Sequence, residues 1–248
     1  MFIMKIQIQV IIIAVCSMIL LCLSGCWSAR EVNDLEIVVG LGVDRLKDSD
    51  DIALTVQIVK PGEMRNPSPE QVGGASQAYW NAHSSGQSIF DAVRDVTHQT
   101  GNRIFVAHSQ VLVFSKEVAE AGIEKYIDFF LRTHEMRPST MIFVSNNTAS
   151  EVLEKKPEKE KLPAMNLSKL IKASKFTSKS QQINLQDFSS RMMSKTASPL
   201  APLIRLSELE GSENYNVMGM AVFKEYCMVG TLDSKETQGY LWVQNEVK

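Results

Sequence analysis

The strongest constraint on the fold is a repeated alternation between short apolar runs and segments with helical spacing. The runs are rich in β-branched and aliphatic residues and are predicted as strands; they cover residues 36–43, 51–59, 77–84, 104–114 and 140–144. Two segments between them, 88–100 and 116–131, are predicted as amphipathic helices. Their expected core stripes are Ile89, Phe90, Val93, Val96 and Thr97, and Ala119, Ile123, Tyr126, Ile127 and Phe130. This order predicts an α+β (mixed α/β) fold, a sheet flanked by helices.

Loops, helix starts and further elements can be predicted from the sequence between residues 61 and 206 in the same way. Residues 61–74 hold three prolines and three glycines and are predicted as an exposed loop. Thr148 and Glu151 have the spacing of a capping box, so a helix is expected to begin there. The remaining predictions are a solvated charged loop at 154–161, helices at 162–170 and 184–193, and an extended segment at 198–206.

The last 36 residues, 213–248, contain a strand, a turn, a second strand and a helix. The predicted strands are 215–223 and 228–232, and the predicted helix is 235–247. A segment shorter than about 40 residues rarely folds alone without disulfides or a metal. We therefore expect these apolar faces either to dock on the preceding domain or to belong to an incomplete second α+β domain. The expected domains are 26–210 and 211–248.

The amino terminus resembles a bacterial lipoprotein signal peptide. An apolar run covers residues 10–23, which is shorter than the roughly 20 residues that cross a bilayer. It ends in Leu23-Ser24-Gly25-Cys26, which resembles a lipobox. The resemblance implies that residues 1–25 are removed and that Cys26 carries a diacylglycerol and an N-acyl chain. The alternative is an uncleaved anchor stretched over residues 6–27.

Composition and cysteine spacing exclude several classes of protein. The formal net charge is −2, or −3 once Lys5 is removed with the signal peptide, so nothing favours nucleic-acid binding. The cysteines lack the paired spacing of zinc or redox sites. After lipidation of Cys26, Cys227 is expected to be a small buried residue. No metal and no cofactor other than the covalent lipid is predicted.

A search for catalytic patterns also favours structural roles. The sequence contains no nucleophile elbow, zincin motif or phosphate-binding loop. Gly40 and Gly42 lack a third glycine and suit close backbone packing better than phosphate binding. His108 is expected to be a hydrogen-bonded structural histidine rather than an acid or base. Arg132 and Arg137 suit either a helix carboxyl terminus, which we favour, or a docking corner.

An ordered series of short matches resembles the Ger(x)C family, the lipoprotein C subunits of spore germinant receptors. The matching stretches are residues 25–27, 30–34, 37–44, 54–59, 107–111, 119–123, 129–138, 219–223, 229–232 and 236–239. Two departures are Ser28-Ala29 after Trp27 and the absence of most of the carboxy-terminal domain found in the family. The resemblance implies a lipid-anchored protein on the outer, extracytoplasmic face of the spore inner membrane, beside the receptor A and B subunits.

We therefore expect a non-enzymatic receptor subunit that spores need to respond to nutrient germinants. The alternative is an extracytoplasmic lipoprotein that binds a small molecule for a transporter. A secreted hydrolase is a third class, which the lack of catalytic patterns disfavours.

Overall fold

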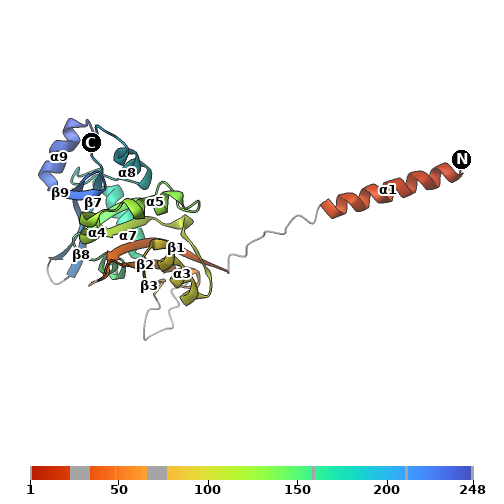
Figure 1. The fold of residues 1–248 in the computed structure, drawn as a ribbon, viewed down its shortest axis with the longest axis horizontal. Coiled ribbons are helices and arrows are strands. Elements are labelled where there is room, and N and C mark those ends of the chain that lie inside the picture. The colour runs from red at the N-terminus through yellow and green to blue at the C-terminus, as the bar shows by residue number, and fades with distance from the viewer. Residues whose placement is uncertain are drawn as a thin grey trace. The chain divides into compact units, whose positions relative to one another are not determined.

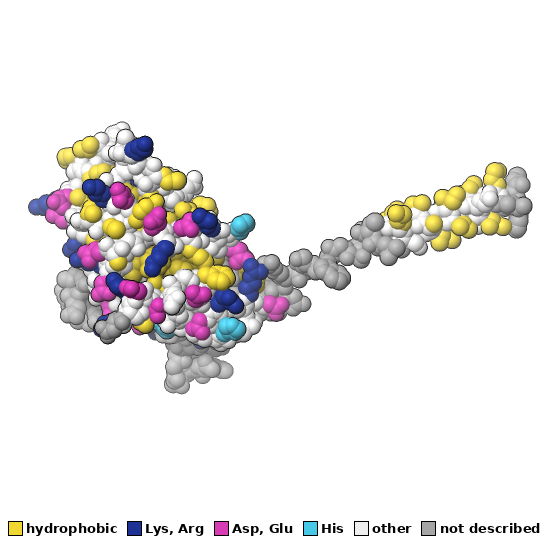
Figure 2. Space-filling model, viewed as in Figure 1, with side chains coloured by type: hydrophobic (Ala, Val, Ile, Leu, Met, Phe, Trp, Pro, Cys, Tyr) yellow, Lys and Arg dark blue, Asp and Glu magenta, His cyan; other side chains and the backbone are white. Residues whose placement is uncertain are grey.

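The computed structural model describes residues 2–22, 34–47, 49–65, 77–157, 160–209 and 212–246. The chain divides into two compact units, Met1–Asp34 and Leu35–Lys248. In the first unit, α1 (Phe2–Cys22) is a helix whose apolar side chains are exposed along its described length (Figure 2). Across the described residues, no helix combines the length and hydropathy needed to cross a membrane. The predicted cleavage site and Cys26 lie outside the described residues.

The second unit is built on one mixed sheet with helices on both faces (Figure 1). Its strands are β1 (Leu35–Arg45), β2 (Ile52–Val59), β3 (Tyr79–Gly86), β4 (Arg103–Phe105), β5 (Val111–Ser115), β6 (Met141–Ser145), β7 (Leu200–Leu209), β8 (Ser212–Lys224) and β9 (Cys227–Leu232). Its helices are α2 (Pro61–Arg65), α3 (Ile89–Thr100), the 3₁₀ turn η2 (Val106–His108), α4 (Lys116–Ala121), α5 (Glu124–Arg132), α6 (Ala149–Glu154), α7 (Pro163–Ser174), α8 (Leu185–Met192) and α9 (Ser234–Val243).

The sheet pairs some strands that are neighbours in sequence and others that are far apart in sequence. The order is β3-β2-β1-β5-β6-β7-β8-β9, with β4 pairing the start of β1. Hairpin partners at the two ends are antiparallel, whereas β1, β5, β6 and β7 run parallel. Parallel neighbours require crossover connections, and the helices between these strands provide them. The predicted α+β class, a sheet flanked by helices, is confirmed.

Each face of the sheet has its own apolar core. Helices α3, α4, α5 and α8 cover one face, where Phe114, Phe130 and Phe188 are buried. Helices α6 and α7 cover the other, with Leu153 and Ile171 against the strands. Covering both faces explains why the central strands are continuous apolar runs rather than alternating ones.

Two long predicted elements are in fact divided. The expected strand 104–114 becomes β4, η2 and β5, because β4 pairs with Leu35–Ile37 whereas β5 pairs with Gly40–Val43. The expected helix 116–131 becomes α4 and α5, since Gly122 takes a positive φ of 113° between them.

Two local predictions also need correction. Residues 61–65 form the short helix α2 instead of loop. Phe90 is exposed, because the buried stripe of α3 consists of Ile89, Ala92 and Val96. The other predicted strands and helices occur within a few residues of their expected bounds.

The carboxy-terminal segment extends the main sheet. Strand β8 pairs with β7 and strand β9 with β8, and both predicted domains lie within the single unit Leu35–Lys248. The Tyr215 hydroxyl donates to the Val152 carbonyl of α6 and lies 3.3 Å from the Lys155 carbonyl. The segment 212–246 is therefore docked, and not a separately packed body. The expected boundary at 210/211 falls at residues that the structure does not describe.

Candidate functional site

Asp44 is a buried carboxylate at the end of β1 that holds the amino terminus of α6. Its two oxygens accept hydrogen bonds from the backbone amides of Ala149 (2.7 Å) and Ser150 (2.9 Å). These amides have no partner within the helix, so the carboxylate satisfies donors that would otherwise be unpaired. Thr148 adds the expected cap, because its hydroxyl accepts from the Glu151 amide.

Burial raises the pKa of the Asp44 carboxyl above its usual value, and the charge of Glu151 raises it further. Hydrogen bonds from Ala149, Ser150 and Ser115 oppose that rise. A pKa that is higher in the folded state means that folding favours the protonated carboxyl. Its contribution to stability is thus full below the unfolded-state pKa and is lost as pH rises through the folded-state pKa.

We expect Asp44→Asn to change how stability depends on pH. As the pH rises from about 4 to 7, the free energy of unfolding of the variant should increase relative to that of wild type. The reason is that only wild type then buries a charged carboxylate. Urea unfolding of both proteins at the two pH values measures this difference. If wild type instead became more stable relative to the variant as the pH rises, the hydrogen bonds to the Asp44 carboxylate would outweigh the effect of its burial. Glu117→Gln, at an exposed position on α4, is the control.

Gln57 is a second polar anchor, fully buried in the middle of β2. Its Nε2 donates to the Leu153 carbonyl (2.8 Å) and to Asn81 Oδ1 (3.1 Å), while its Oε1 accepts from the Ala164 amide (3.0 Å). One amide side chain therefore ties the end of α6 to the start of α7. A polar residue inside the apolar run of β2 is the signal that could have indicated this role, which the sequence analysis missed.

Gly40 and Gly42 allow α6 and α7 to approach β1 closely. A Cβ at Gly40 would lie 2.9 Å from the Ala164 Cβ, and one at Gly42 would lie 3.1 Å from the Ala149 Cβ. Real side chains do not pack at such distances without displacement. The interpretation of this pair as a close-packing device is confirmed.

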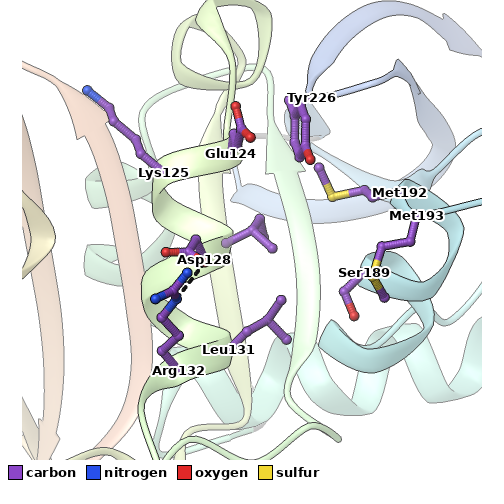
Figure 3. Close-up of a pocket in the computed structure, with 10 residues that line it drawn as sticks. Glu124, Lys125, Asp128, Leu131, Arg132, Ser189, Met192, Met193 and Tyr226 are labelled. Carbon is purple, nitrogen blue, oxygen red and sulfur yellow. Dashed lines mark hydrogen bonds and ion pairs between the residues drawn. The ribbon is translucent and has the colours of Figure 1, made fainter.

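A groove of about 520 Å³ lies between α5, α8 and the β8–β9 turn (Figure 3). Its apolar lining consists of Ile127, Leu131, Met192, Met193 and Tyr226, and its polar lining of Glu124, Lys125, Asp128, Arg132 and Ser189. The Ile123 amide donates to the Tyr226 carbonyl (3.0 Å), which fixes the turn against α5. The groove combines thioether, aliphatic and aromatic surface with a charged rim.

Three polar side chains of the groove form local hydrogen bonds. Arg132 Nε donates to Asp128 Oδ1 (2.8 Å), as the dashed line in Figure 3 shows, and Ser189 Oγ donates to the Gln186 carbonyl (3.0 Å). Among the residues that line the groove, no hydroxyl is hydrogen-bonded to a general base.

The residues singled out from the sequence do not converge on one site. His108 lies in η2 at an exposed position, with its ring 5.6 Å from the Phe105 ring and in no hydrogen bond within the described residues, so the hydrogen-bonded structural histidine that was expected is not found. Arg132 ends α5 and pairs with Asp128, which supports its structural interpretation. Arg137 is exposed nearby. Cys227 is also exposed, contrary to the expectation of burial.

The described part of the chain thus defines a mixed-sheet α+β protein with a groove between α5, α8 and the β8–β9 turn. Within that part, no group of three or more His, Cys, Asp or Glu residues is arranged to hold a metal ion. The model of the spore germination protein N-terminal domain matches residues 28–206, and that of the spore germination B3/GerAC-like C-terminal domain matches residues 218–248. The chain belongs to this family of spore germination proteins.

Curated relatives from Bacillus subtilis (strain 168) agree with this assignment. The chain is 26% identical to spore germination protein KC, with 91% of this chain and 60% of the relative covered. It is 25% identical to spore germination protein YndF (98% and 65%) and 24% identical to spore germination protein B3 (92% and 60%). The chain therefore spans less than two thirds of the length of these relatives.

A solved structure, the crystal structure of the GerBC protein, matches with a TM-score of 0.41 and 18% identity. The match covers 84% of this chain and 56% of the GerBC chain.

Proposed function

We propose that this chain is a membrane-anchored, non-enzymatic subunit of a nutrient germinant receptor, needed for the response of spores to germinants. The family match over residues 28–206 is the observation that carries the proposal. Relatives named as spore germination proteins support it over most of this chain. We further propose that the receptor A and B subunits are its partners at the outer face of the spore inner membrane.

Anchoring in this proposal depends on Cys26. The lipobox-like sequence Leu23-Ser24-Gly25-Cys26 directly follows the apolar run of the amino terminus. Each buried methylene contributes about 0.8 kcal/mol to membrane binding, so two or three acyl chains hold a protein stably at the surface. A tethered protein meets membrane partners at high effective concentration, so modest contacts at the groove are sufficient for assembly.

The decisive experiment is deletion and complementation in spores of the organism that carries this chain. Loss of the chain should reduce the response to at least one nutrient mixture, whereas germination by a nutrient-independent trigger should be unchanged. Restoration by the wild-type chain, but not by a chain made without lipid attachment, supports the proposal. An unchanged response to every nutrient would contradict it. Calorimetric titration with transported nutrients tests the alternative of a transporter's binding protein.

Lipidation gives a separate prediction. A tagged fatty acid should label the wild-type chain strongly and leave Cys26→Ala unlabelled, because the thiol is the proposed site of diacylglycerol attachment. Cys227→Ala keeps the lipobox and should label like wild type. Gel fluorescence after metabolic labelling measures both. Equal labelling of wild type and Cys26→Ala would disprove lipidation at this residue.

A further inference from the structure

A basic stretch without acidic residues covers α7 and its connection to α8. Between Leu162 and Gln186 the sequence contains four lysines and no aspartate or glutamate. Lys169 pairs with Glu160. The other three lysines, Lys172, Lys175 and Lys179, are exposed and form no ion pair within the described residues. This stretch of sequence therefore carries a net positive charge, although the chain as a whole carries a formal net charge of −2 and Gln181 within the stretch contacts the Glu246 carboxylate.

The same stretch exposes an aromatic side chain. Phe176 is 77% exposed, and the Lys175 ammonium lies 5.0 Å from the centre of its ring. Lysine side chains are well solvated by water, whereas an exposed phenyl ring leaves apolar area in water, which is unfavourable. Lysines around an exposed aromatic residue are typical of surfaces that lie on lipid headgroups, where the ring enters the interface and the ammonium groups meet phosphates. We call residues 172–179 the lysine–phenylalanine surface.

This surface is fixed to the fold and is not a loose tail. Ser174, Ser178 and Ser180 are buried beneath it, and Ser180 Oγ donates to the Gly219 carbonyl (3.1 Å) in β8. The Gly219 amide donates to the Lys179 carbonyl (2.8 Å). Ser178, just before these contacts, adopts a positive φ of 52°. The lysines and Phe176 are thereby held outward, so binding would lose little conformational entropy of the backbone.

Two sets of contacts place this stretch on the sheet: Lys179 and Ser180 bond to Gly219 of β8, and Asn184 bridges to β6. Asn184, which follows the surface, forms a bridge with Met141, the first residue of β6. Met141 is in register with Val111 of β5, which is in register with Gly40 of β1.

We propose that the lysine–phenylalanine surface binds anionic phospholipid headgroups, with Phe176 entering the interface. The charge of the surface and the ring at its centre support a lipid partner. An acidic patch on a protein would match the lysines but gives no role to a solvent-exposed phenyl ring. The membrane that this surface meets in the spore depends on the proposed lipid anchoring. The ability of the surface to bind anionic lipid does not depend on the anchoring, and it is measured separately from germination.

The test is lysine footprinting of the full chain reconstituted into vesicles. One set contains phosphatidylcholine alone, and the other contains about 30 mol % phosphatidylglycerol, which supplies the anionic surface. Acylation of Lys172, Lys175 and Lys179, measured by mass spectrometry, should fall about fivefold on the anionic vesicles and recover in about 0.5 M NaCl. Lys47 and Lys116, two exposed lysines outside the lysine–phenylalanine surface, serve as internal controls and should not change.

Two variants complete the design. Phe176→Ser should reduce the protection of the neighbouring lysines on anionic vesicles, whereas Phe90→Ser, at an exposed aromatic position on α3, should leave it unchanged. Circular dichroism checks that each variant is folded. Equal labelling on both vesicle types would overturn the proposal. Protection that appears only when spore membrane proteins are added would also overturn it, in favour of a protein partner.

Discussion

Gln57→Ala should destabilise the protein by about 3 kcal/mol, one of the two largest effects that we expect. The substitution removes three hydrogen bonds from a fully buried position and leaves the Ala164 amide without its acceptor. A buried donor left unsatisfied costs about 1–3 kcal/mol, and the cavity adds to that loss. Denaturant unfolding followed by circular dichroism measures the change.

Gln99→Ala is the matched control for this experiment. Gln99 Nε2 also donates two hydrogen bonds, to the His83 carbonyl (3.0 Å) and to Asp95 Oδ2 (2.9 Å), but its side chain is exposed on α3. Water replaces such partners, so the free energy of unfolding should change by less than about 0.5 kcal/mol. Similar losses for Gln57→Ala and Gln99→Ala would show that Gln57 does not anchor α6 and α7.

Gly40→Val should be comparably severe, for a steric reason. A Cβ at this position already lies within 3.1 Å of Leu153 Cδ2 as well as close to Ala164, and valine adds two methyl groups. Both neighbours belong to helices held by Gln57, so neither can withdraw without breaking that anchor. Overpacking of a dense core costs about 1–3 kcal/mol, and we expect the upper end. Thermal and urea unfolding measure it.

Gly239→Ala is a control at a glycine where substitution should increase stability rather than reduce it. Gly239 lies inside α9, and a Cβ there meets no atom within 4 Å. Alanine favours helices over glycine by about 0.5–1 kcal/mol, so this variant should be slightly stabilised. Destabilisation at Gly239 with tolerance at Gly40 would contradict the packing described for α6, α7 and β1.

Hydrophobic patterning predicted the element order and the fold class because each strand and helix buries a continuous apolar run or stripe. It did not predict the division of 104–114, since β4 and β5 are both apolar and only their different partners along β1 separate them. It also did not predict the break at Gly122, where apolar spacing continues across the turn. Long-range pairing and a single backbone angle decide these points.

The candidate site was less predictable for a related reason. Asp44 and Gln57 act through amides that lie about 100 residues away in the sequence, so no local spacing marks them. The groove is formed by α5, α8 and Tyr226, which come together only in the folded chain. His108, by contrast, drew attention through its apolar neighbours, although the structure leaves its ring at the surface.

The unequal lengths of the strand ladders have a mechanical consequence. Strands β7 and β8 share nine register pairs, whereas β6 and β7 share two, Val144 with Leu203 and Ser145 with Ile204. If one end of the sheet were held through β1 and a partner pulled on α9, the tension would cross every ladder in series. The shortest ladder would yield first, and β7, β8, β9 and α9 would peel away together. Under tension, the protein would thus separate near residue 199, about ten residues before the domain boundary at 210/211 that the sequence predicted.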